Sequence, residues 1–262
     1  MNKHGSDGNL SGRSHPVHLD NPLARKLEHF VRLSIDDRVQ LAAALSPIRT
    51  IAARADIREE GDDPRSVNVI LDGWACRYRQ LPNGQRQIVS LLLPGDPCDP
   101  QAFEQRRVHH AIGALTPVSL AQIRGSAMKE LTARNSALDE AFLHERLSAT
   151  AIQYEWTVSL GRRSAIERLA HLFCELYARL DAVGLADGAS CPMLLTQTDL
   201  ANALGQTSVH INRTLKELRG MELIALQSRR LTITDHARLQ TLAMFEPTYV
   251  LDDEAATSAQ RL

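Results

Sequence analysis

The sequence predicts an α+β protein in which an N-terminal β-roll, a long helix and a C-terminal winged helix-turn-helix follow one another. Three observations support this fold class. Residues 48–123 alternate short β-rich runs with turns, and residues 135–160 contain neither glycine nor proline. Residues 196–218 have the pattern of two short helices joined by a tight turn, and residues 223–233 that of a hairpin.

The length and charge of the chain limit its organisation. With 262 residues, 44% of them hydrophobic, it can form two domains or one large one. The 30 Lys and Arg residues against 31 Asp and Glu residues give a formal charge of −1, so any surface that attracts a polyanion must be local. Residues 196–234 carry five basic and three acidic side chains, a local basic excess of two.

The cysteines and the ends of the chain indicate a reduced, cytoplasmic protein. Cys76, Cys98, Cys174 and Cys191 are far apart and form no CxxC pair, which fits neither a disulfide framework nor a zinc site. Residues 1–20 are polar and rich in Gly and Ser, without the apolar core of a secretory signal, and are expected to be disordered. No stretch approaches the roughly 20 apolar residues of a membrane helix.

The β-rich region follows short helices within residues 21–45. Asn83-Gly84 lies between two alternating runs and is a strong hairpin motif. Short strands at regular spacing with such turns predict a small β-barrel or β-roll. The expected strands are residues 48–57, 68–71, 75–81, 87–93, 111–115 and 119–123.

Residues 135–160 can form one long helix whose apolar residues occupy more than one narrow face. A helix that needs burial on two sides can pack on its own β-domain and on a second copy of itself. The residues expected at such a dimer contact are Phe142, Leu147, Ile152 and Trp156. The alternative is a helix buried wholly within one subunit.

Residues 196–218 (TQTDLANALGQTSVHINRTLKEL) are the most informative stretch of the chain. Thr196 and Asp199 form a capping-box-like helix start, and Gly205 falls where the chain must turn sharply. Thr207 can cap a second helix whose inward face is formed by Val209 or Ile211, together with Leu215 and Leu218. Its outward face carries side chains suited to base edges and phosphates, namely Ser208, His210, Asn212, Arg213 and Lys216. The alternative is an ordinary helical hairpin on the surface.

Residues 223–233 (LIALQSRRLTI) form two short apolar runs directly after the second helix, which predicts a β-hairpin. A helix-turn-helix followed by such a hairpin is a winged helix. Arg229 and Arg230 at its tip suit phosphate contacts. The alternative for the two arginines is a solvated turn.

Together these features resemble the Crp/Fnr family of bacterial transcription regulators, over residues 21–245. The most specific parts are the roll turns, DGWACRYRQLPNGQRQIVSLLLPGD at residues 72–96, and the helix-turn-helix. The resemblance implies a cyclic-nucleotide-binding-like roll as sensor, a long helix that joins two subunits, and a winged helix that binds an inverted-repeat operator, with RNA polymerase as a further possible partner. The expected organisation is a disordered 1–20, a sensor roll with flanking helices at 21–133, a dimerisation helix at 134–161, a DNA-binding domain at 162–248 and a flexible tail at 249–262.

The resemblance assigns roles to the second helix of the helix-turn-helix. Arg213 matches an arginine that family members direct at a guanine of the half-site. Ser208 and Val209 stand where better-known members carry an Arg-Glu pair, so the operator is expected to depart from the best-known consensus. Val209 could touch a thymine methyl group. The full set expected at DNA is Thr207, Ser208, Val209, His210, Asn212, Arg213, Lys216, Arg229 and Arg230.

The expected effector pocket, formed by Cys98, Val108, His109 and His110, departs from the cyclic-AMP-binding pattern. Pro100 stands where the family's ribose-binding carboxylate would be, and Val108-His109 where its phosphate-binding Arg-Ser pair would be. A buried cyclic phosphate would then lack its counter-charge, so tight binding of cyclic AMP is not expected. The N-terminal cysteine cluster of iron–sulfur members is missing from the sequence as well.

Other functions stay open at this point. Cys98 with His109 and His110 could bind haem or a metal, or Cys98 could be an oxidisable thiol, in a module that acts through protein contacts. The alternative is that these side chains simply line the roll, and no cofactor is expected. An enzyme is not expected either, because no nucleophile–base set, P-loop or metal-ligand spacing occurs.

Overall fold

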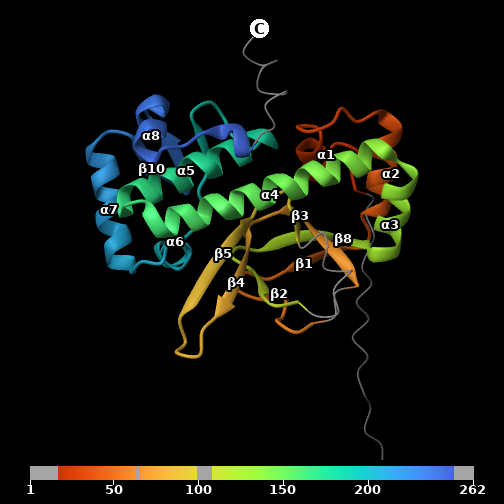
Figure 1. Cartoon of the computed structure of the whole chain (residues 1–262), viewed down its shortest axis with the longest axis horizontal. Helices are drawn as coiled ribbons and strands as arrows, with labels where there is room; N and C mark the ends of the chain where they lie inside the picture. Colours follow the sequence, from red (N-terminus) through yellow and green to blue (C-terminus); the bar gives the residue numbers. More distant parts are fainter. Residues whose placement is uncertain (1–16, 63–64, 99–107, 251–262) are drawn as a thin grey trace, which may run out of the picture.

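The computed structural model describes residues 17–62, 65–98 and 108–250, and it confirms the predicted order of β-roll, long helix and winged helix (Figure 1). Residues 1–16 and 251–262, which hold most of the expected disordered ends, lie outside this part of the chain. Among the described residues, no helix is long and apolar enough to span a lipid bilayer.

The β-roll consists of two four-stranded antiparallel sheets, with strand orders β1-β8-β3-β6 and β2-β7-β4-β5. Cys98, on β6, packs between them among buried aliphatic side chains that include Ile70, Ile112 and Leu120. The strand expected at 48–57 is split, because the chain turns at 52–55 and Arg54 there is left-handed with a φ of 67°. The strands are β1 (Ile48–Ile51), β2 (Asp56–Arg58), β3 (Ser66–Asp72), β4 (Ala75–Gln80), β5 (Arg86–Leu92), β6 (Pro97–Cys98), β7 (Ala111–Ala114) and β8 (Val118–Arg124).

Helices close one end of the roll and connect it to the C-terminal domain. A shared apolar cluster contains Leu23 of α1, Leu41 of α2 and Phe142 of α4. In Figure 1, α4 crosses the molecule from this end to the C-terminal domain. The helices are α1 (Pro22–Leu27), α2 (Ile35–Ala44), α3 (Gly125–Arg134) and α4 (Ser136–Arg162).

The two faces of α4 are different, and this corrects the expected dimer contact. Phe142, Ile152 and Trp156 are buried inside the subunit, so they are not accessible to a partner. Leu147, by contrast, is 57% exposed. It belongs to a stripe of exposed apolar residues at spacings of four, seven and four, which places them on one side of the helix. These residues are Leu143, Leu147, Tyr154 and Val158.

The C-terminal domain packs on the roll and shares one hydrophobic core with it. Trp74, Ile88 and Leu91 of the roll belong to the same buried cluster as Leu169 and Phe173 of α5. A three-stranded sheet of order β10-β11-β9 completes the domain. Its elements are α5 (Ala165–Ala182), β9 (Ser190–Pro192), α6 (Gln197–Leu204), α7 (Ser208–Gly220), β10 (Ile224–Gln227), β11 (Arg230–Ile233), α8 (His236–Ala243) and a 3-10 turn, η2 (Pro247–Tyr249).

The chain after α8 returns to the long helix. The Tyr249 hydroxyl lies 2.9 Å from a ring nitrogen of His171, and the Ser148 hydroxyl on α4 donates to the carbonyl oxygens of Tyr249 and Val250. Val250 is buried. These two residues therefore belong to the packed structure rather than to the loose tail expected from residue 249.

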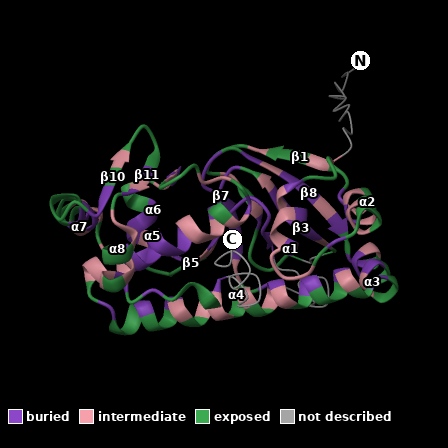
Figure 2. Cartoon of the chain, turned by 90° about the horizontal axis from the view of Figure 1, so that it is seen from above, coloured by how far each residue is buried: buried purple, intermediate pink, exposed green. Residues whose placement is uncertain are grey.

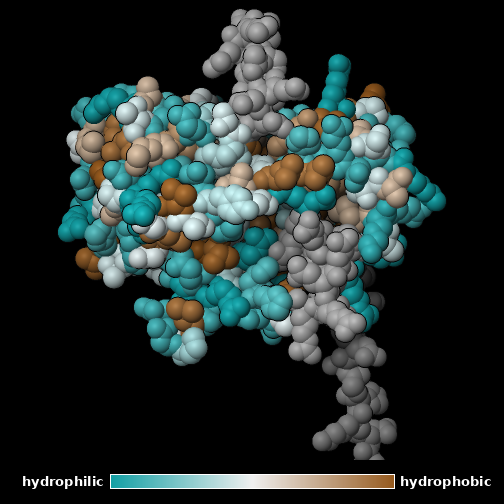
Figure 3. Space-filling model, viewed as in Figure 1, coloured by the Kyte–Doolittle hydropathy of each residue, from teal (hydrophilic) through white to brown (hydrophobic). Residues whose placement is uncertain are grey.

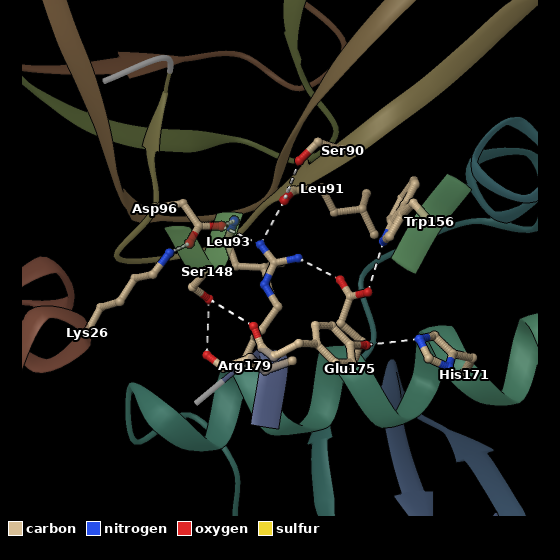
Figure 4. Close-up of polar contacts among 12 residues, drawn as sticks. Lys26, Ser90, Leu91, Leu93, Asp96, Ser148, Trp156, His171, Glu175 and Arg179 are labelled. Atoms are coloured by element: carbon tan, nitrogen blue, oxygen red, sulfur yellow. Dashed lines mark hydrogen bonds and ion pairs between the residues drawn. The ribbon is translucent and has the colours of Figure 1, made fainter. Parts of the chain in front are cut away.

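A buried polar network joins the roll to the helices, centred on Asp96 (Figure 4). Its carboxylate accepts from Lys26 Nζ at 2.6 Å, from an Arg179 guanidinium nitrogen at 2.6 Å and from the Leu93 backbone at 2.7 Å. Arg179 also binds Glu175 and the Leu91 carbonyl oxygen. Burial raises the pKa of the Asp96 carboxyl, but Lys26 and Arg179 lower it further, so its pKa lies below the ordinary value and Asp96 is ionised.

We predict that Arg179→Met lowers the free energy of unfolding by about 3–5 kcal/mol, because it leaves the buried Glu175 without its cationic partner and Asp96 with Lys26 as its remaining counter-charge. Urea denaturation followed by circular dichroism measures the change. The control is Arg134→Met, which removes an arginine from an exposed pair with Glu130 and should cost less than about 1 kcal/mol. Equal losses in the two variants would contradict the prediction.

Candidate nucleic-acid interface

Helix α6 begins and ends as its sequence predicts. The Thr196 hydroxyl accepts from the Asp199 backbone, and the Asp199 carboxylate accepts from the Thr196 backbone, which completes a capping box. Gly205 ends the helix in the left-handed conformation with a φ of 63°, where other residues are strained. Gly205 therefore sets the angle at which the chain enters α7.

Helix α7 packs on the domain core with one face and leaves the other free. Thr207 caps it by accepting from the His210 backbone at 3.2 Å. Ile211 is fully buried whereas Val209 is 82% exposed, which decides between the two inward positions left open by the sequence. Figure 2 shows α7 at the end of the molecule opposite α2 and α3, with exposed residues along it. The inward face consists of Ile211, Thr214, Leu215 and Leu218.

The outward face of α7 brings together the side chains expected at DNA. Val209, Arg213 and Lys216 are exposed. An Arg213 guanidinium nitrogen lies 3.3 Å from a ring nitrogen of His210, so the two side chains occupy one patch. Asn212 donates to the Gln197 side chain on α6 at 3.3 Å. Thr207 is exposed as well, and Ser208, His210 and Asn212 are half-buried.

The wing is the hairpin of β10 and β11, with Gln227 paired to Arg230. Ser228 and Arg229 form its tip with φ values of 50° and 59°, the geometry of a two-residue turn that fits the twist of a hairpin. Both arginines are exposed, but they differ in their contacts. Arg230 donates to the Ser190 carbonyl oxygen at 3.3 Å, while the carbonyl of Arg229 accepts from Met193 and fixes the turn.

Two arginines that the sequence did not single out hold α6 at its ends. Arg168 of α5 donates to the carbonyl oxygens of Leu204, at the end of α6, and of Leu160, near the end of α4. Arg54 of the roll binds Asp199 at the start of α6. Neither arginine belongs to a local sequence motif. Arg54 and Asp199 are 145 positions apart, and Arg168 binds backbone carbonyl groups, which every residue carries. Only the structure therefore reveals these contacts.

The residues expected to line the effector pocket do not form one cluster of accessible polar groups. Cys98 and Val108 are buried, whereas His109 is exposed and its carbonyl oxygen accepts from Arg79. Val108 pairs through its backbone with Gly61 and Asp62. Pro100, which the resemblance places at the ribose-binding position, lies outside the described residues.

The alternatives of a metal or a reactive thiol receive no support from the described residues. No three His, Cys, Asp or Glu side chains lie together within 17–62, 65–98 and 108–250 in a way that could hold a metal ion. The Cys98 side chain has no exposed surface, and the carboxylate of Asp96 is bound by Lys26 and Arg179.

Comparisons with known proteins agree with this architecture. A profile of the cyclic nucleotide-binding domain matches residues 48–135, and one of the Crp-like helix-turn-helix domain matches residues 167–242. The chain is 32% identical to the nitrogen fixation regulation protein FixK of Bradyrhizobium diazoefficiens over 187 residues, which cover 70% of this chain and 76% of that protein. It is 28% identical to the transcriptional activator protein FnrL of Cereibacter sphaeroides over 196 residues, or 73% of this chain and 78% of that one.

A solved structure shares the fold. FixK2 from Bradyrhizobium japonicum superposes with a TM-score of 0.65 and 20% identity, and the match covers 75% of this chain and 96% of that one.

Proposed function

We propose that this chain, which belongs to the Crp/Fnr family of transcription regulators, binds an inverted-repeat DNA operator as a homodimer that places α7 of each subunit in the major groove. The observation that carries the proposal is the exposed outward face of α7, held by a capped helix-turn-helix and flanked by a wing with arginines at its tip. Two such helices related by a two-fold axis would meet half-sites about 34–36 Å apart.

Each part of this surface suits a different contact with DNA. The Arg213 guanidinium can donate two parallel hydrogen bonds to a guanine, and Val209 offers a methyl-bearing side chain to a thymine. Lys216 and Arg229 are exposed cations suited to phosphates, as are the donors Thr207 and Ser208 near the start of the helix. His210 and Asn212 complete the surface. His210 lies against Arg213, and Asn212 donates to Gln197.

The exposed stripe of α4 supports the homodimer. Leu143, Leu147, Tyr154 and Val158 lie on the side of the helix that faces away from the core, and Figure 3 shows apolar side chains gathered along the course of α4. A cleft beside Leu147, which Ala151 and Tyr249 also line, adds concave surface to this side. An apolar stripe at coiled-coil spacing on a long helix suits a parallel pairing with a second α4. The proposed subunit contact therefore keeps Leu147. It uses the exposed Leu143, Tyr154 and Val158 in place of the buried Phe142, Ile152 and Trp156.

Regulation does not depend on cyclic AMP in this proposal. The positions that the resemblance aligns with the phosphate-binding pair carry a buried valine, Val108, and an exposed histidine, His109. Neither side chain offers the fork of donors with which an arginine neutralises a buried phosphate.

We expect Arg213→Met to lower the ratio of specific to non-specific DNA affinity roughly tenfold to a hundredfold, because the guanine contact is lost while the phosphate contacts remain. Operator fragments recovered by genome-wide occupancy, and then titrated in gel-shift assays against scrambled duplexes, give the ratio. Arg219→Met removes a charge from the last turn of the same helix and serves as the control. An Arg213→Met protein that footprints the same site at the same concentration would refute the role of Arg213.

Leu147→Glu should convert the dimer to a monomer, since it places charges of like sign opposite each other on the two-fold axis. Sedimentation equilibrium measures the mass. The matched control is Ile35→Glu, at an exposed isoleucine in the first turn of α2, outside the exposed stripe of α4. A dimer that survives Leu147→Glu unchanged would place the subunit contact elsewhere.

Cyclic AMP is expected to bind the protein with no better than millimolar affinity, because the cyclic phosphate would enter the roll without its counter-charge. Isothermal titration calorimetry of the whole protein tests this expectation directly. A dissociation constant in the low micromolar range would show that another group supplies the charge.

A further inference from the structure

An ion pair links the β-roll directly to the first helix of the helix-turn-helix. The two guanidinium nitrogens of Arg54 lie 2.6 Å and 2.9 Å from the two carboxylate oxygens of Asp199, although the residues are 145 positions apart in the chain. Such a two-pronged contact fixes the relative orientation of the groups as well as their distance.

The roll holds Arg54 in a conformation that arginine rarely adopts. Its φ of 67° is left-handed, and its backbone N–H donates to the carbonyl oxygen of Ala114 on β7 at 2.9 Å. Glycine or asparagine would occupy this turn with less strain. The turn therefore presents the Arg54 guanidinium from a fixed point of the sheet.

Asp199 is equally fixed on the other side of the contact. Its side chain is 4% exposed, and its carboxylate also accepts from the backbone and hydroxyl of Thr196 at the start of α6. Burial raises the pKa of this carboxyl, but the hydrogen bonds from Arg54 and Thr196 outweigh burial, so the pKa lies below its ordinary value. Asp199 is thus an ionised group that belongs to the frame of α6.

A second contact from the roll meets the far end of the same helix. The Gln87 side chain on β5 donates to the carbonyl oxygen of Ala203 at 3.1 Å. Ala203 lies two residues before Gly205, where the chain turns into α7. The roll therefore touches α6 at both ends, and α6 leads directly into the helix proposed to enter DNA.

We infer that Arg54 is a positioning residue for DNA recognition, which acts through Asp199 to set the orientation of α6 and α7 relative to the β-roll. The orienting role follows from the contacts in one subunit, whereas its consequence for DNA rests on the proposed function. Two experiments separate these parts.

The first experiment measures the orientation without DNA. Spin labels are placed at Asn83→Cys on the roll and Glu217→Cys on α7, both exposed, while all four native cysteines are buried. Labelled chains are diluted with excess unlabelled protein so that only pairs within one subunit count. Arg54→Met should broaden or shift the distance distribution, and Arg54→Lys should restore it in part, because lysine keeps the charge but not the fork.

Arg79→Met is the matched control, since Arg79 is a half-exposed arginine of the same roll that pairs with Glu60 and not with α6. It should leave the distances as in the wild type. An unchanged distribution in Arg54→Met overturns the inference, whatever the protein does with DNA.

The second experiment measures operator geometry with the full chain. The operators differ in the spacing between their half-sites. Each base pair that is added or removed rotates one half-site relative to the other by about a tenth of a helical turn. Arg54→Met should weaken binding to the best spacing by roughly threefold to tenfold and reduce the preference for that spacing. In a double-mutant cycle, adding Asp199→Asn to Arg54→Met should change the spacing preference less than adding it to the wild type.

The outcomes of the two experiments separate the orienting role of Arg54 from its consequence for DNA recognition. A wild-type protein that binds no duplex defeats the proposed function, while the label distances still decide whether Arg54 orients α6. A spacing preference that stays intact in Arg54→Met, despite altered distances, overturns the role in DNA recognition. If Arg54→Met lowers the affinity at all spacings by the same factor, the role in DNA recognition is overturned as well, because a misplaced helix must alter the spacing preference.

Discussion

The carboxylate of Asp96 is the group on which the arrangement of the whole subunit depends. A buried carboxylate is stable only when donors surround it, and here the donors come from three separate parts of the chain: Lys26 of α1, Arg179 of α5 and the backbone of Leu93 in the roll. Its neighbour Gly95 allows the turn to lie directly against α1, since a Cβ on Gly95 would be 2.6 Å from the carbonyl oxygen of Pro22. The Gly-Asp turn therefore joins the roll, the N-terminal helices and the C-terminal domain at one point.

This junction also lies next to the segment in which the family resemblance places the effector pocket. Only Pro97 separates Asp96 from Cys98, and Pro97 and Cys98 pair as β6 with Val69 and Asn68 of β3. On its other side the junction reaches α5, whose Arg179 binds the Leu91 carbonyl oxygen at the end of β5. A displacement of β6 inside the roll would therefore act on the helix that carries the DNA-binding domain, through contacts that are short, charged and buried.

The sequence predicted local features well, because their causes lie within a few residues. The capping box at Thr196 and Asp199, the left-handed Gly205 and the hairpin around Ser228 and Arg229 each depend on neighbours in the chain, and each was found where it was expected. Long-range pairing could not be predicted in this way. Nothing in the sequence near Asp96 indicates that Lys26 and Arg179 bind its carboxylate. The prediction for α4 was wrong for the same reason: apolar residues occur on both faces, and long-range contacts decide which face is covered.

The two faces of α4 are not interchangeable, and the reason is polar rather than apolar. On the inward side, Trp156 donates to Glu175 at 2.9 Å and Glu145 accepts from Lys26 at 3.1 Å. A rotation of the helix about its axis would break both contacts and leave buried polar groups without partners. These two bonds therefore favour the observed orientation over others that also bury apolar side chains. The stripe that contains Leu147 is therefore directed outward by bonds on the opposite face, so the same network that fixes the core of one subunit also directs outward the surface that we propose pairs with a second copy.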